Sequence, residues 1–339
     1  MAPVLFLTHE RFLDHDTGRG HPERPARLGA VFDGLEEAGL SEVLTRCAPR
    51  PATAEELALV HTPSYLRTVE TFCANGGGDL DPDTTVVPAS WDAAVLAAGA
   101  GLTAIEALDA GSADAAFCAV RPPGHHAMPA RAMGFCFVNN VAVSAAVLAA
   151  RGERVLILDW DAHHGNGTQD AFYDDPRVLF VSLHQYPFWP GTGALQDMGE
   201  GDGHGFTINV PFPAGTQGDA YRAAIAEVVE PAAERFKPTW ALLSAGFDAH
   251  RADPLTNLGL TAGDYVELTS RVMSLVPPGR RIAFLEGGYD LDALARCAAA
   301  CVGALAGETV RAEPVSTGDL GRSVVKDVLR VHGLHNPRP

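Results

Sequence analysis

The stretch VLILDWDAHH, residues 155–164, decides the fold, because a short apolar run ends directly in a cluster of acids and histidines. Val155–Asp159 is apolar up to its final acid, which is typical of a strand buried on both faces of a sheet. Similar runs recur along the chain and alternate with segments of helical periodicity. This alternation predicts an α/β fold with a mostly parallel sheet and helices on both faces.

The same criteria predict the other elements of the chain. The predicted strands are Val4–Thr8, Ala115–Val120, Val155–Asp159, Val178–Leu183, Phe206–Val210, Trp240–Ser244 and Ile282–Leu285. The predicted helices are Pro25–Ala38, Pro63–Ala74, Ser90–Asp109, Asn140–Ala150, Asp219–Arg235, Ala262–Ser274 and Leu291–Leu305. We expect Gly76–Asp83 and Arg311–Pro339 to be irregular. Because the chain has no repeat and no low-complexity linker, we expect one domain over residues 1–339, although none of the motifs described below extends into residues 308–339.

The composition is that of a globular protein with a full-sized core, since 47% of the 339 residues are hydrophobic and 20% are charged. Such an apolar content excludes a disordered chain. The 25 basic and 42 acidic residues give a net charge of −17, and no run of Lys or Arg interrupts this excess. We therefore expect no direct binding of nucleic acid, whose phosphates such a surface repels.

Membrane attachment and disulfide bonds are not expected either. The apolar run Val4–Leu7 is too short for a signal peptide, and no window approaches 18 unbroken apolar residues. The six cysteines form no CxxC pair, and a chain of this size does not need disulfides for stability. We therefore expect reduced thiols and a cytoplasmic protein, and we expect it to form a homo-oligomer.

The acids and histidines after Val155–Leu158 indicate a metal site. Asp159, Asp161 and His163 share one face of an extended chain, where two carboxylates repel each other unless a cation lies between them. Asp248 follows another apolar run, and together with Asp161 and His163 it gives the three protein ligands that are typical of a catalytic zinc ion. The alternative is that these acids cap helices or face solvent.

Two further clusters follow predicted strands. RPPGHH (121–126) holds His125 and His126 on a stiff loop, where they could act as a general base and its electrostatic partner beside a metal-bound water. EGGY (286–289) places Tyr289 after a turn, where its hydroxyl could donate to a developing oxyanion. The alternatives are two surface histidines and a core tyrosine.

Six blocks of sequence carry these residues in order along the chain. They are HPERP (21–25), RPPGHHA (121–127), GFCFVNN (134–140), DWDAHHGNGTQ (159–169), SAGFDAHRADPL (244–255) and EGGYD (286–290). Together they resemble the zinc-dependent histone deacetylase superfamily, and most closely its class II branch and the bacterial deacetylase-like and acetylpolyamine amidohydrolases. The resemblance runs from about Leu5 to about Gly307. It implies the arginase–deacetylase fold, with a central eight-stranded parallel sheet.

The activity that this resemblance implies is removal of an acetyl group from acetyl-lysine or from a small N-acetylated amine or polyamine by metal-activated water. The substrate would be the partner of this chain. One zinc ion per chain would be bound by Asp161, His163 and Asp248. His125 and His126 would be the catalytic histidine pair, with His126 as the main general base.

Other positions take their roles from the resemblance alone. Tyr289 would polarise the acetyl carbonyl, and Asn166 would lie behind the general base, where this chain has the class II residue. Asp159 would hydrogen-bond the first histidine of the pair. A structural potassium ion would be bound by Asp159, Ser182 and Leu183.

A narrow tunnel for the acyl-lysine stem is also implied by the resemblance. Phe135 and Trp189 would form its walls, Gly134 and Gly288 would contribute to it, and Arg27 would line the exit path for acetate. At the rim, Leu255 replaces the Glu of a polyamine-preferring relative, which weakens a strict acetylpolyamine role. Asp79, Asp81 and Asp83 could supply rim carboxylates instead, and Asp83 is the best placed of them to meet a substrate amide or amine.

Two alternatives compete with a deacetylase. A ureohydrolase of the arginase type shares the fold but binds two manganese ions, and it needs carboxylates where this chain has Gly165 and His250. A non-catalytic relative that kept the fold for binding would be favoured by loss of a zinc ligand or of Tyr289, and none of these residues is missing.

Overall fold

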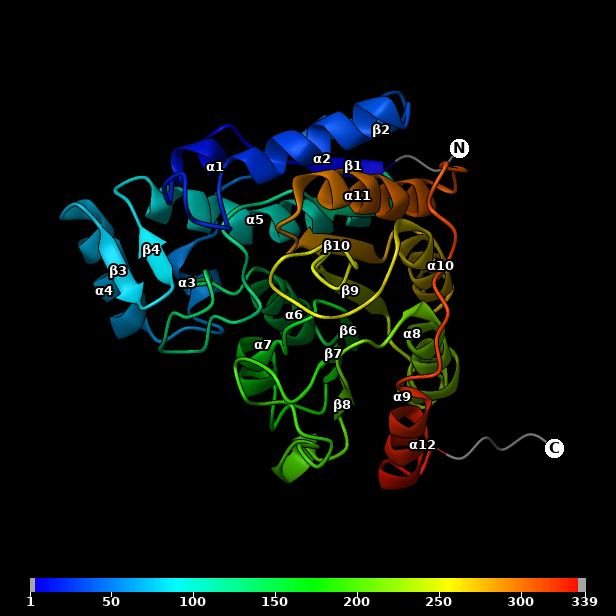
Figure 1. The fold of residues 1–339 in the computed structure, drawn as a ribbon. Coiled ribbons are helices and arrows are strands. Elements are labelled where there is room, and N and C mark those ends of the chain that lie inside the picture. The colour runs from blue at the N-terminus through cyan, green and yellow to red at the C-terminus, as the bar shows by residue number, and fades with distance from the viewer. Residues whose placement is uncertain (1–3, 335–339) are drawn as a thin grey trace.

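An eight-stranded sheet in which all neighbouring strands are parallel lies at the centre of the computed structural model, which describes residues 4–334 (Figure 1). Its strand order is β2-β1-β5-β10-β9-β6-β7-β8. The strands are β1 (Val4–Leu7), β2 (Leu44–Cys47), β5 (Ala115–Cys118), β6 (Val155–Asp159), β7 (Val178–Gln185), β8 (Thr207–Phe212), β9 (Trp240–Ala245) and β10 (Arg281–Leu285).

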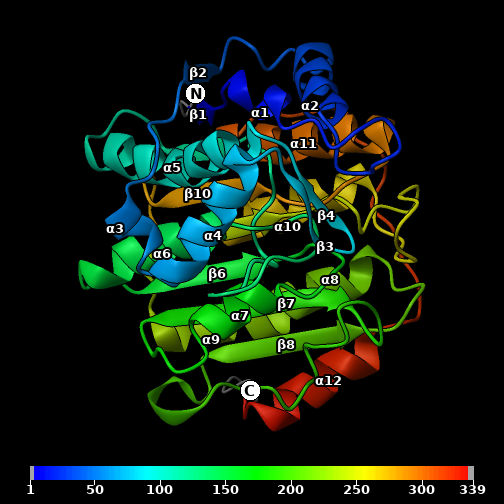
Figure 2. The same cartoon turned by 90° about the vertical axis from the view of Figure 1, so that its left-hand side faces the viewer.

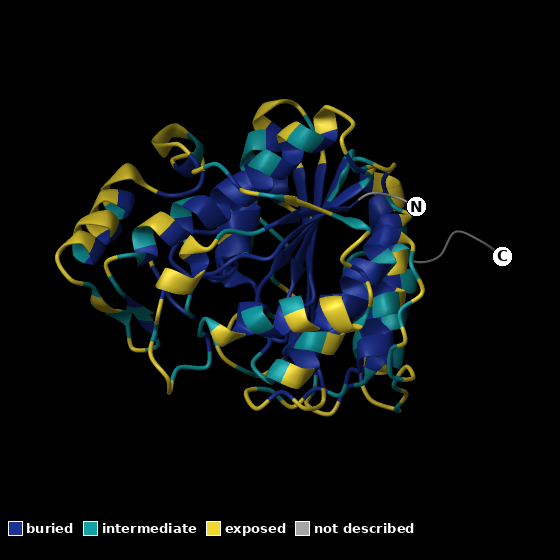
Figure 3. Ribbon diagram, turned by 90° about the horizontal axis from the view of Figure 1, so that it is seen from above, coloured by how far each residue is buried: buried dark blue, intermediate teal, exposed yellow. Residues whose placement is uncertain are grey.

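The buried strands confirm the prediction from apolar runs. All seven predicted strands are present, and β5, β6 and β9 are buried along their whole length. Helices cover both faces of the sheet, so its centre is the most buried part of the molecule (Figure 3). This is the environment in which strands can be apolar on both sides.

The helices fall into two packed groups. On one side α5 packs against α1, α4 and α6, and on the other α2, α11, α10 and α8 follow one another in contact. Their bounds are α1 (Arg11–Asp14), α2 (Ala26–Glu37), α3 (Ala54–Leu57), α4 (Pro63–Ala74), α5 (Ser90–Asp109), α6 (Asn140–Ala150), α7 (Asn166–Ala171), α8 (Gly218–Ala224), α9 (Glu230–Phe236), α10 (Ala262–Met273), α11 (Leu291–Ala306) and α12 (Arg322–Val331). A turn of π-helix, Ile225–Val229, joins α8 to α9, and a 3-10 turn covers Gly201–Gly203.

Helix α5 is long and apolar enough to cross a membrane by length and composition alone, and it is the one helix within residues 4–334 for which this holds. Its 20 residues have a mean hydropathy of 1.3 in the most apolar window, and 67% of that window is buried. Because α5 packs against β5 and α6, its apolar composition is explained by burial in the domain.

Two segments at the amino-terminal side differ from the prediction. Gly76–Asp83 is not irregular, because β3 (Gly78–Asp81) pairs antiparallel with β4 (Thr84–Val86) in a hairpin beside α4 (Figure 2). The hydroxyl of Thr85 donates to the Asp79 carboxylate across this hairpin, at 2.7 Å. Strand β2 was also missed, because an edge strand that is half exposed carries no continuous apolar run.

The expectation of an irregular tail is wrong for part of its length. Arg322–Val331 forms α12, which packs against β8 and α8 through the buried side chains of Val325 and Val328. The apolar residues Val324, Val325, Val328 and Leu329 recur at helical spacing, which is a signal that the prediction missed. Residues 335–339 of the predicted irregular segment lie outside the described part of the chain.

A buried ion network ties the amino-terminal segment to the sheet. Glu23 accepts hydrogen bonds from Arg121, at 2.7 Å, and from Arg27, at 3.1 Å, and all three side chains are fully buried. The Arg121 guanidinium also donates to the carbonyls of Phe12, at 2.7 Å, and His15, at 3.0 Å. The Glu23 carboxylate is therefore the shared anionic partner of two buried arginines.

Glu23→Gln should lower the free energy of unfolding by about 3 kcal/mol or more, because removing one charge of a buried network leaves its partners uncompensated. Urea unfolding of the full chain measures this loss. The control is Glu36→Gln on the exposed face of α2, for which we expect a change within about 0.5 kcal/mol. Equal effects of the two substitutions would contradict the role of Glu23.

The effect of Glu23→Gln should depend on pH. Burial alone would raise the pKa of Glu23, but Arg121, with His15 and Arg27, holds it well below its usual value. A carboxylate whose pKa is lowered by folding stabilises the folded state above its unfolded pKa, about 4.3, and this contribution is lost as the pH falls through the folded pKa. The difference between the parent and Glu23→Gln should therefore be constant near pH 7 and shrink below about pH 4.

Candidate active site and metal centre

The polar clusters meet because the strands that precede them are neighbours in the sheet. β5, β10, β9 and β6 lie side by side and run in the same direction, so their carboxyl ends share one edge. The loop after β5 carries the histidine pair, and the loop after β10 carries Tyr289. The loops after β9 and β6 carry Asp248 and the Asp161–His163 pair. Ligand sites at this edge are the rule in open α/β sheets.

Asp161, His163 and Asp248 come together as a candidate metal centre. One ligand atom of each lies within 4.8 Å of the others, and they form the one such group among residues 4–334. His163 Nδ1 lies 2.8 Å from Asp248 Oδ2 and 3.2 Å from Asp161 Oδ1. Two buried carboxylates and one imidazole around a shared point are a donor set that fits a catalytic zinc ion.

The carboxylates of this centre are held by backbone groups from other loops. The N–H of Gly287 donates to Asp161 Oδ2 and the N–H of Ala162 donates to Asp248 Oδ1, both at 2.8 Å. Gly246 and Gly287 pass so close to Asp161 that a Cβ at either position would collide with its carboxylate. These positions require glycine because the backbone itself surrounds the acids.

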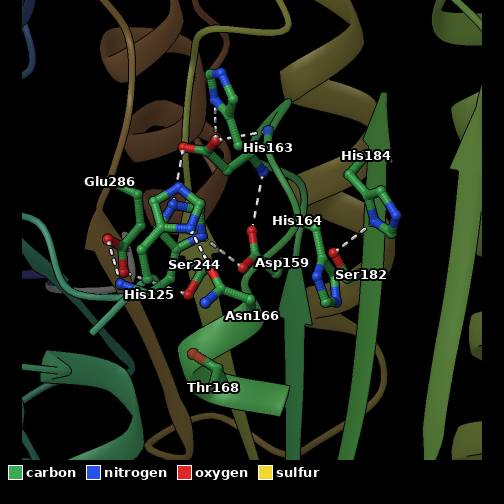
Figure 4. A network of polar contacts seen from close by, with 12 residues as sticks. His125, Asp159, His163, His164, Asn166, Thr168, Ser182, His184, Ser244 and Glu286 are labelled. Carbon is green, nitrogen blue, oxygen red and sulfur yellow. Dashed lines mark hydrogen bonds and ion pairs between the residues drawn. The ribbon is translucent and has the colours of Figure 1, made fainter. Parts of the chain in front are cut away.

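The two histidines of the RPPGHH loop have different partners (Figure 4). His125 Nδ1 lies 2.9 Å from Asp159 Oδ2, and both residues are labelled in the figure. His126 Nδ1 lies 2.8 Å from Asn166 Oδ1. The two rings are 3.9 Å apart between centroids, and both side chains are buried. The hydrogen bond expected between His125 and the Asp159 carboxylate and the position expected for Asn166 behind His126 are therefore present in the structure.

These partners move the pKa values of the histidines in opposite directions. Burial alone would lower the pKa of His125, but Asp159 and Asp161 raise it to about 10. Burial lowers the pKa of His126 well below its usual value, and the charges of His125 and His163 lower it further. The two neighbouring histidines therefore differ in their tendency to bind a proton, with His125 favouring the protonated form and His126 the neutral form.

A cavity of about 210 Å³ opens from this centre to the surface. Its walls contain seven of the predicted substrate and catalytic residues together with His163, and also Phe188, which the sequence did not single out. The lining residues are Asp83, His126, Gly134, Phe135, His163, Phe188, Trp189, Leu255 and Tyr289. The exposed side chains of Trp189 and Leu255 lie at its mouth, being 40% and 36% exposed.

The aromatic rings make the cavity narrow. The rings of His126 and Trp189 meet edge to face with their centroids 4.7 Å apart, and Phe188 stacks on His163 at 5.3 Å. Phe135 meets Tyr289 edge to face at 5.8 Å. Burial raises the pKa of Tyr289 well above its usual value, so its hydroxyl remains a donor.

Two predicted tunnel residues lie behind the cavity wall. Arg27 is fully buried, with its guanidinium carbon 5.1 Å from the centroid of the Tyr289 ring. The Arg27 Nε donates to the carbonyl of Gly288 at 2.8 Å. Neither residue is among those that line the cavity. Arg27 contacts the Tyr289 ring and binds the carbonyl of the residue before it, so both residues help to hold Tyr289 in position.

The predicted potassium ligands lie on adjacent strands. Asp159 and Ser182 are paired in register on β6 and β7. The Ser182 hydroxyl lies 2.9 Å from Nδ1 of His184, and the Leu183 carbonyl accepts from the hydroxyl of Tyr221 at 3.4 Å. Potassium binding here stays a prediction.

Some residues that shape the site were not recognised in the sequence. The hydroxyl of Thr84 accepts the Phe135 N–H at 3.1 Å, beside the bond in which Asp83 Oδ1, a predicted rim carboxylate, accepts the Gly134 N–H at 3.0 Å. Glu286 accepts the Gly124 N–H at 2.7 Å and thereby fixes the loop of the histidine pair. The acid of the EGGY motif is a signal that could have identified Glu286, whereas nothing local marks Thr84.

Comparison with known proteins agrees with this geometry. The family model described as the histone deacetylase domain matches residues 21–305. A probable deacetylase from Archaeoglobus fulgidus is 43% identical over 290 residues, which cover 84% of this chain and 80% of the relative. A histone deacetylase-like amidohydrolase from Pseudomonas aeruginosa is 39% identical over 317 residues, covering 92% of this chain and 80% of the relative.

The fold has a close counterpart among solved structures. The crystal structure of the HDA15 HD domain superposes with a TM-score of 0.91 at 38% identity, and the match covers 98% of this chain and 94% of that one. The sheet is therefore that of the arginase–deacetylase fold, as the sequence predicted. With the matched domain, this shows that the chain belongs to the histone deacetylase family.

The candidate metal centre can be tested by binding alone. Zinc at about 100 times its Kd should raise the free energy of unfolding of the metal-free chain by about 2.7 kcal/mol. Asp248→Ala removes one of three ligands and should abolish this gain, whereas Asp202→Ala removes an exposed acid and should retain it. Thermal unfolding and metal analysis measure both effects. A full zinc content in Asp248→Ala would refute the ligand assignment.

Proposed function

We propose that this protein is a zinc-dependent amidohydrolase that removes the acetyl group from acetyl-lysine or from a small N-acetylated amine. The observation that supports the proposal is the cavity that His126, His163 and Tyr289 share, because two imidazoles and a phenol hydroxyl line one narrow space there. Membership of the histone deacetylase family supports the same reaction class.

Asp161, His163 and Asp248 would hold the zinc ion. Zinc bound there would polarise the amide carbonyl and make a bound water more acidic at neutral pH. The carboxylates keep their orientation because the N–H of Ala162 binds Asp248 Oδ1 and the N–H of Gly287 binds Asp161 Oδ2, which in each case is the oxygen that does not contact His163 Nδ1.

The hydrogen bond between His126 and Asn166 determines which ring nitrogen of His126 can accept a proton. The side-chain oxygen of Asn166 can only accept, so His126 carries its hydrogen on Nδ1 and keeps the lone pair on Nε2. His126 Nε2 would take the proton of the attacking water, and the imidazolium would then donate to the leaving amine. His125 stays protonated against Asp159 and favours the neutral form of His126.

The hydroxyl of Tyr289 would donate to the oxygen that gains negative charge as the water attacks. Its backbone is fixed from two sides, since the Tyr289 N–H donates to Asp253 Oδ2 at 2.7 Å and the Gly288 carbonyl is bound by Arg27. A donor that is held before the reaction need not reorganise during it, which is why such groups contribute strongly to the rate.

The cavity favours a slender, unbranched stem with a cationic neighbour. Phe135, Phe188 and Trp189 leave room for a methylene chain, and the carboxylate of Asp83 lies at the same opening. Both acetyl-lysine peptides and N-acetylated polyamines have this form, and the net charge of −17 suits either.

The two-metal alternative has no support in the geometry. The imidazole of His250 is engaged with Glu313, its Nε2 lying 2.8 Å from the carboxylate, and Gly165 offers no side chain. The non-catalytic alternative predicts no hydrolysis by the zinc-loaded chain. A fluorogenic acetyl-lysine assay with zinc present distinguishes it from the proposal.

Tyr289→Phe should lower kcat for an acetyl-lysine substrate by about 10²–10³-fold, because one preorganised oxyanion donor is lost. Its zinc content should equal that of the parent. Tyr173→Phe, which removes a hydroxyl outside the cavity, serves as the control and should retain full activity. Full activity of Tyr289→Phe would exclude the proposed role.

Leu255→Glu should shift preference towards acetylpolyamines, because a carboxylate at the rim attracts the distant ammonium groups that a peptide lacks. We expect the ratio of kcat/KM for acetylpolyamine over acetyl-lysine peptide to rise about tenfold, or about 1.4 kcal/mol. Leu255→Gln introduces a side chain of the same size as Glu without its charge, so it should leave the ratio unchanged. The same shift in both variants would show that charge at the rim does not select the substrate.

A further inference from the structure

The segment between α11 and α12 lies beyond the matched domain and packs against the loop that carries Asp248. We call residues 308–316 the C-terminal strap; in Figure 1 it passes α10 and α8 on its way to α12. The Thr261 hydroxyl donates to the carbonyl of Pro314 at 2.8 Å, and the Ser316 hydroxyl donates to Asp264 at 2.6 Å. The strap is therefore attached to the start of α10 by side-chain hydrogen bonds.

Glu313 is the residue of the strap that reaches towards the site. Its carboxylate accepts from His250 Nε2 at 2.8 Å, from Arg251 at 2.6 Å and from the Ala262 N–H at 3.2 Å. Burial alone would raise the pKa of Glu313, but His250, Ala262 and Arg251 lower it to about 2. Glu313 is therefore an ionised acceptor, which strengthens its hydrogen bonds.

The tautomer of His250 is fixed by its own loop. The Ala252 N–H donates to His250 Nδ1 at 3.1 Å, so the ring hydrogen of the neutral imidazole lies on Nε2 and points at Glu313. The His250 side chain is buried, with 1% exposure. Without Glu313 this buried N–H would lose its acceptor, which destabilises the ring position.

The turn that contains His250 joins two groups of the proposed mechanism. Asp248 lies two residues before His250 in the chain. After it, the Asp253 N–H donates to the His250 carbonyl at 2.9 Å. Asp253 in turn accepts the backbone N–H of Tyr289 at 2.7 Å. A chain of contacts therefore runs from Glu313 through His250 to the metal-binding carboxylate on one side and to Tyr289 on the other.

We propose that Glu313 is a positioning residue: through His250 it holds the turn from Asp248 to Asp253, so that the C-terminal strap fixes both the Asp248 carboxylate and the backbone of Tyr289. What this turn does in catalysis rests on the proposed function, whereas the mechanical link from strap to turn does not. Arg251 is 60% exposed and reaches the same carboxylate from solvent, so its ion pair should contribute little.

Glu313→Ala and Glu313→Gln in the full chain test this role, with Arg251→Ala as the matched control. Arg251→Ala removes the exposed partner of the same carboxylate and leaves the bond to His250. Amide hydrogen exchange over residues 246–256 and 286–290 reports the turn directly. The rate of zinc loss to a chelator, together with kcat and KM, reports its effect on the site.

We expect Glu313→Ala to exchange at least about tenfold faster in both segments, with β6 and β7 unchanged, and to lose zinc about tenfold faster, the lower end of the range for lost support of a metal ligand. Its kcat should fall several-fold at unchanged KM. Glu313→Gln retains an oxygen acceptor for His250 and should recover most of these properties, and Arg251→Ala should match the parent within twofold.

Unchanged exchange in the two segments of Glu313→Ala would overturn the proposal. Equal effects of Arg251→Ala, or faster exchange spread evenly over the sheet, would also overturn it, because either result reports general loss of stability. If the parent neither binds zinc nor hydrolyses acetyl-lysine while exchange behaves as expected, the proposed function fails and the positioning role of Glu313 stands.

Discussion

Four buried carboxylates lie at one edge of the sheet, and the loops around them are arranged to compensate their charge. Burial raises the pKa of Asp248 and of Glu286 to about 7. The reason is that a carboxylate removed from water favours its neutral, protonated form. Three of the four acids are bound by the backbone of a neighbouring loop, whereas Asp159 accepts the N–H of Asp161 in its own loop. Asp161 accepts from the loop after β10, Asp248 from the loop after β6, and Glu286 from the loop after β5. The loops are thereby cross-linked, and the same bonds leave Asp161, His163 and Asp248 facing one point.

The sheet and the edge on which the site lies could be predicted from sequence because both follow from local patterns. A strand buried on both faces must be apolar along its length, and this pattern identified β6 and β9 within one residue of their ends. In a parallel sheet the residues that follow such strands meet at one edge, whatever the order of the strands. The proximity of Asp161 and Asp248, 87 positions apart in the chain, also depends on β6 and β9 being neighbours in the sheet, which the local patterns do not show.

Other parts of the site depend on packing between distant segments, which no local pattern reveals. Phe188 lines the cavity because the loop after β7 folds back over His163, and one aromatic residue in a loop does not predict that. The exit-path role expected of Arg27 stays a prediction, and its hydrogen bond to the Gly288 carbonyl and its position over Tyr289 could not be seen in the sequence. The helix α12 has an amphipathic pattern that the prediction missed, and the surface of β8 and α8 that its apolar side packs against could not be seen in the sequence.

The hairpin of β3 and β4 has a consequence for how such cavities change during evolution or design. Phe135 adopts a φ of 67°, an unfavourable value for a residue with a side chain, and Thr84 accepts its N–H while Asp83 accepts that of Gly134. The wall of the cavity is thus encoded by two segments that are about 50 residues apart in the sequence. Exchanging only one of the two segments between relatives would remove the hydrogen bonds that orient the Phe135 ring. The hairpin and the segment that carries Phe135 should therefore be inherited, or transplanted in a design, together.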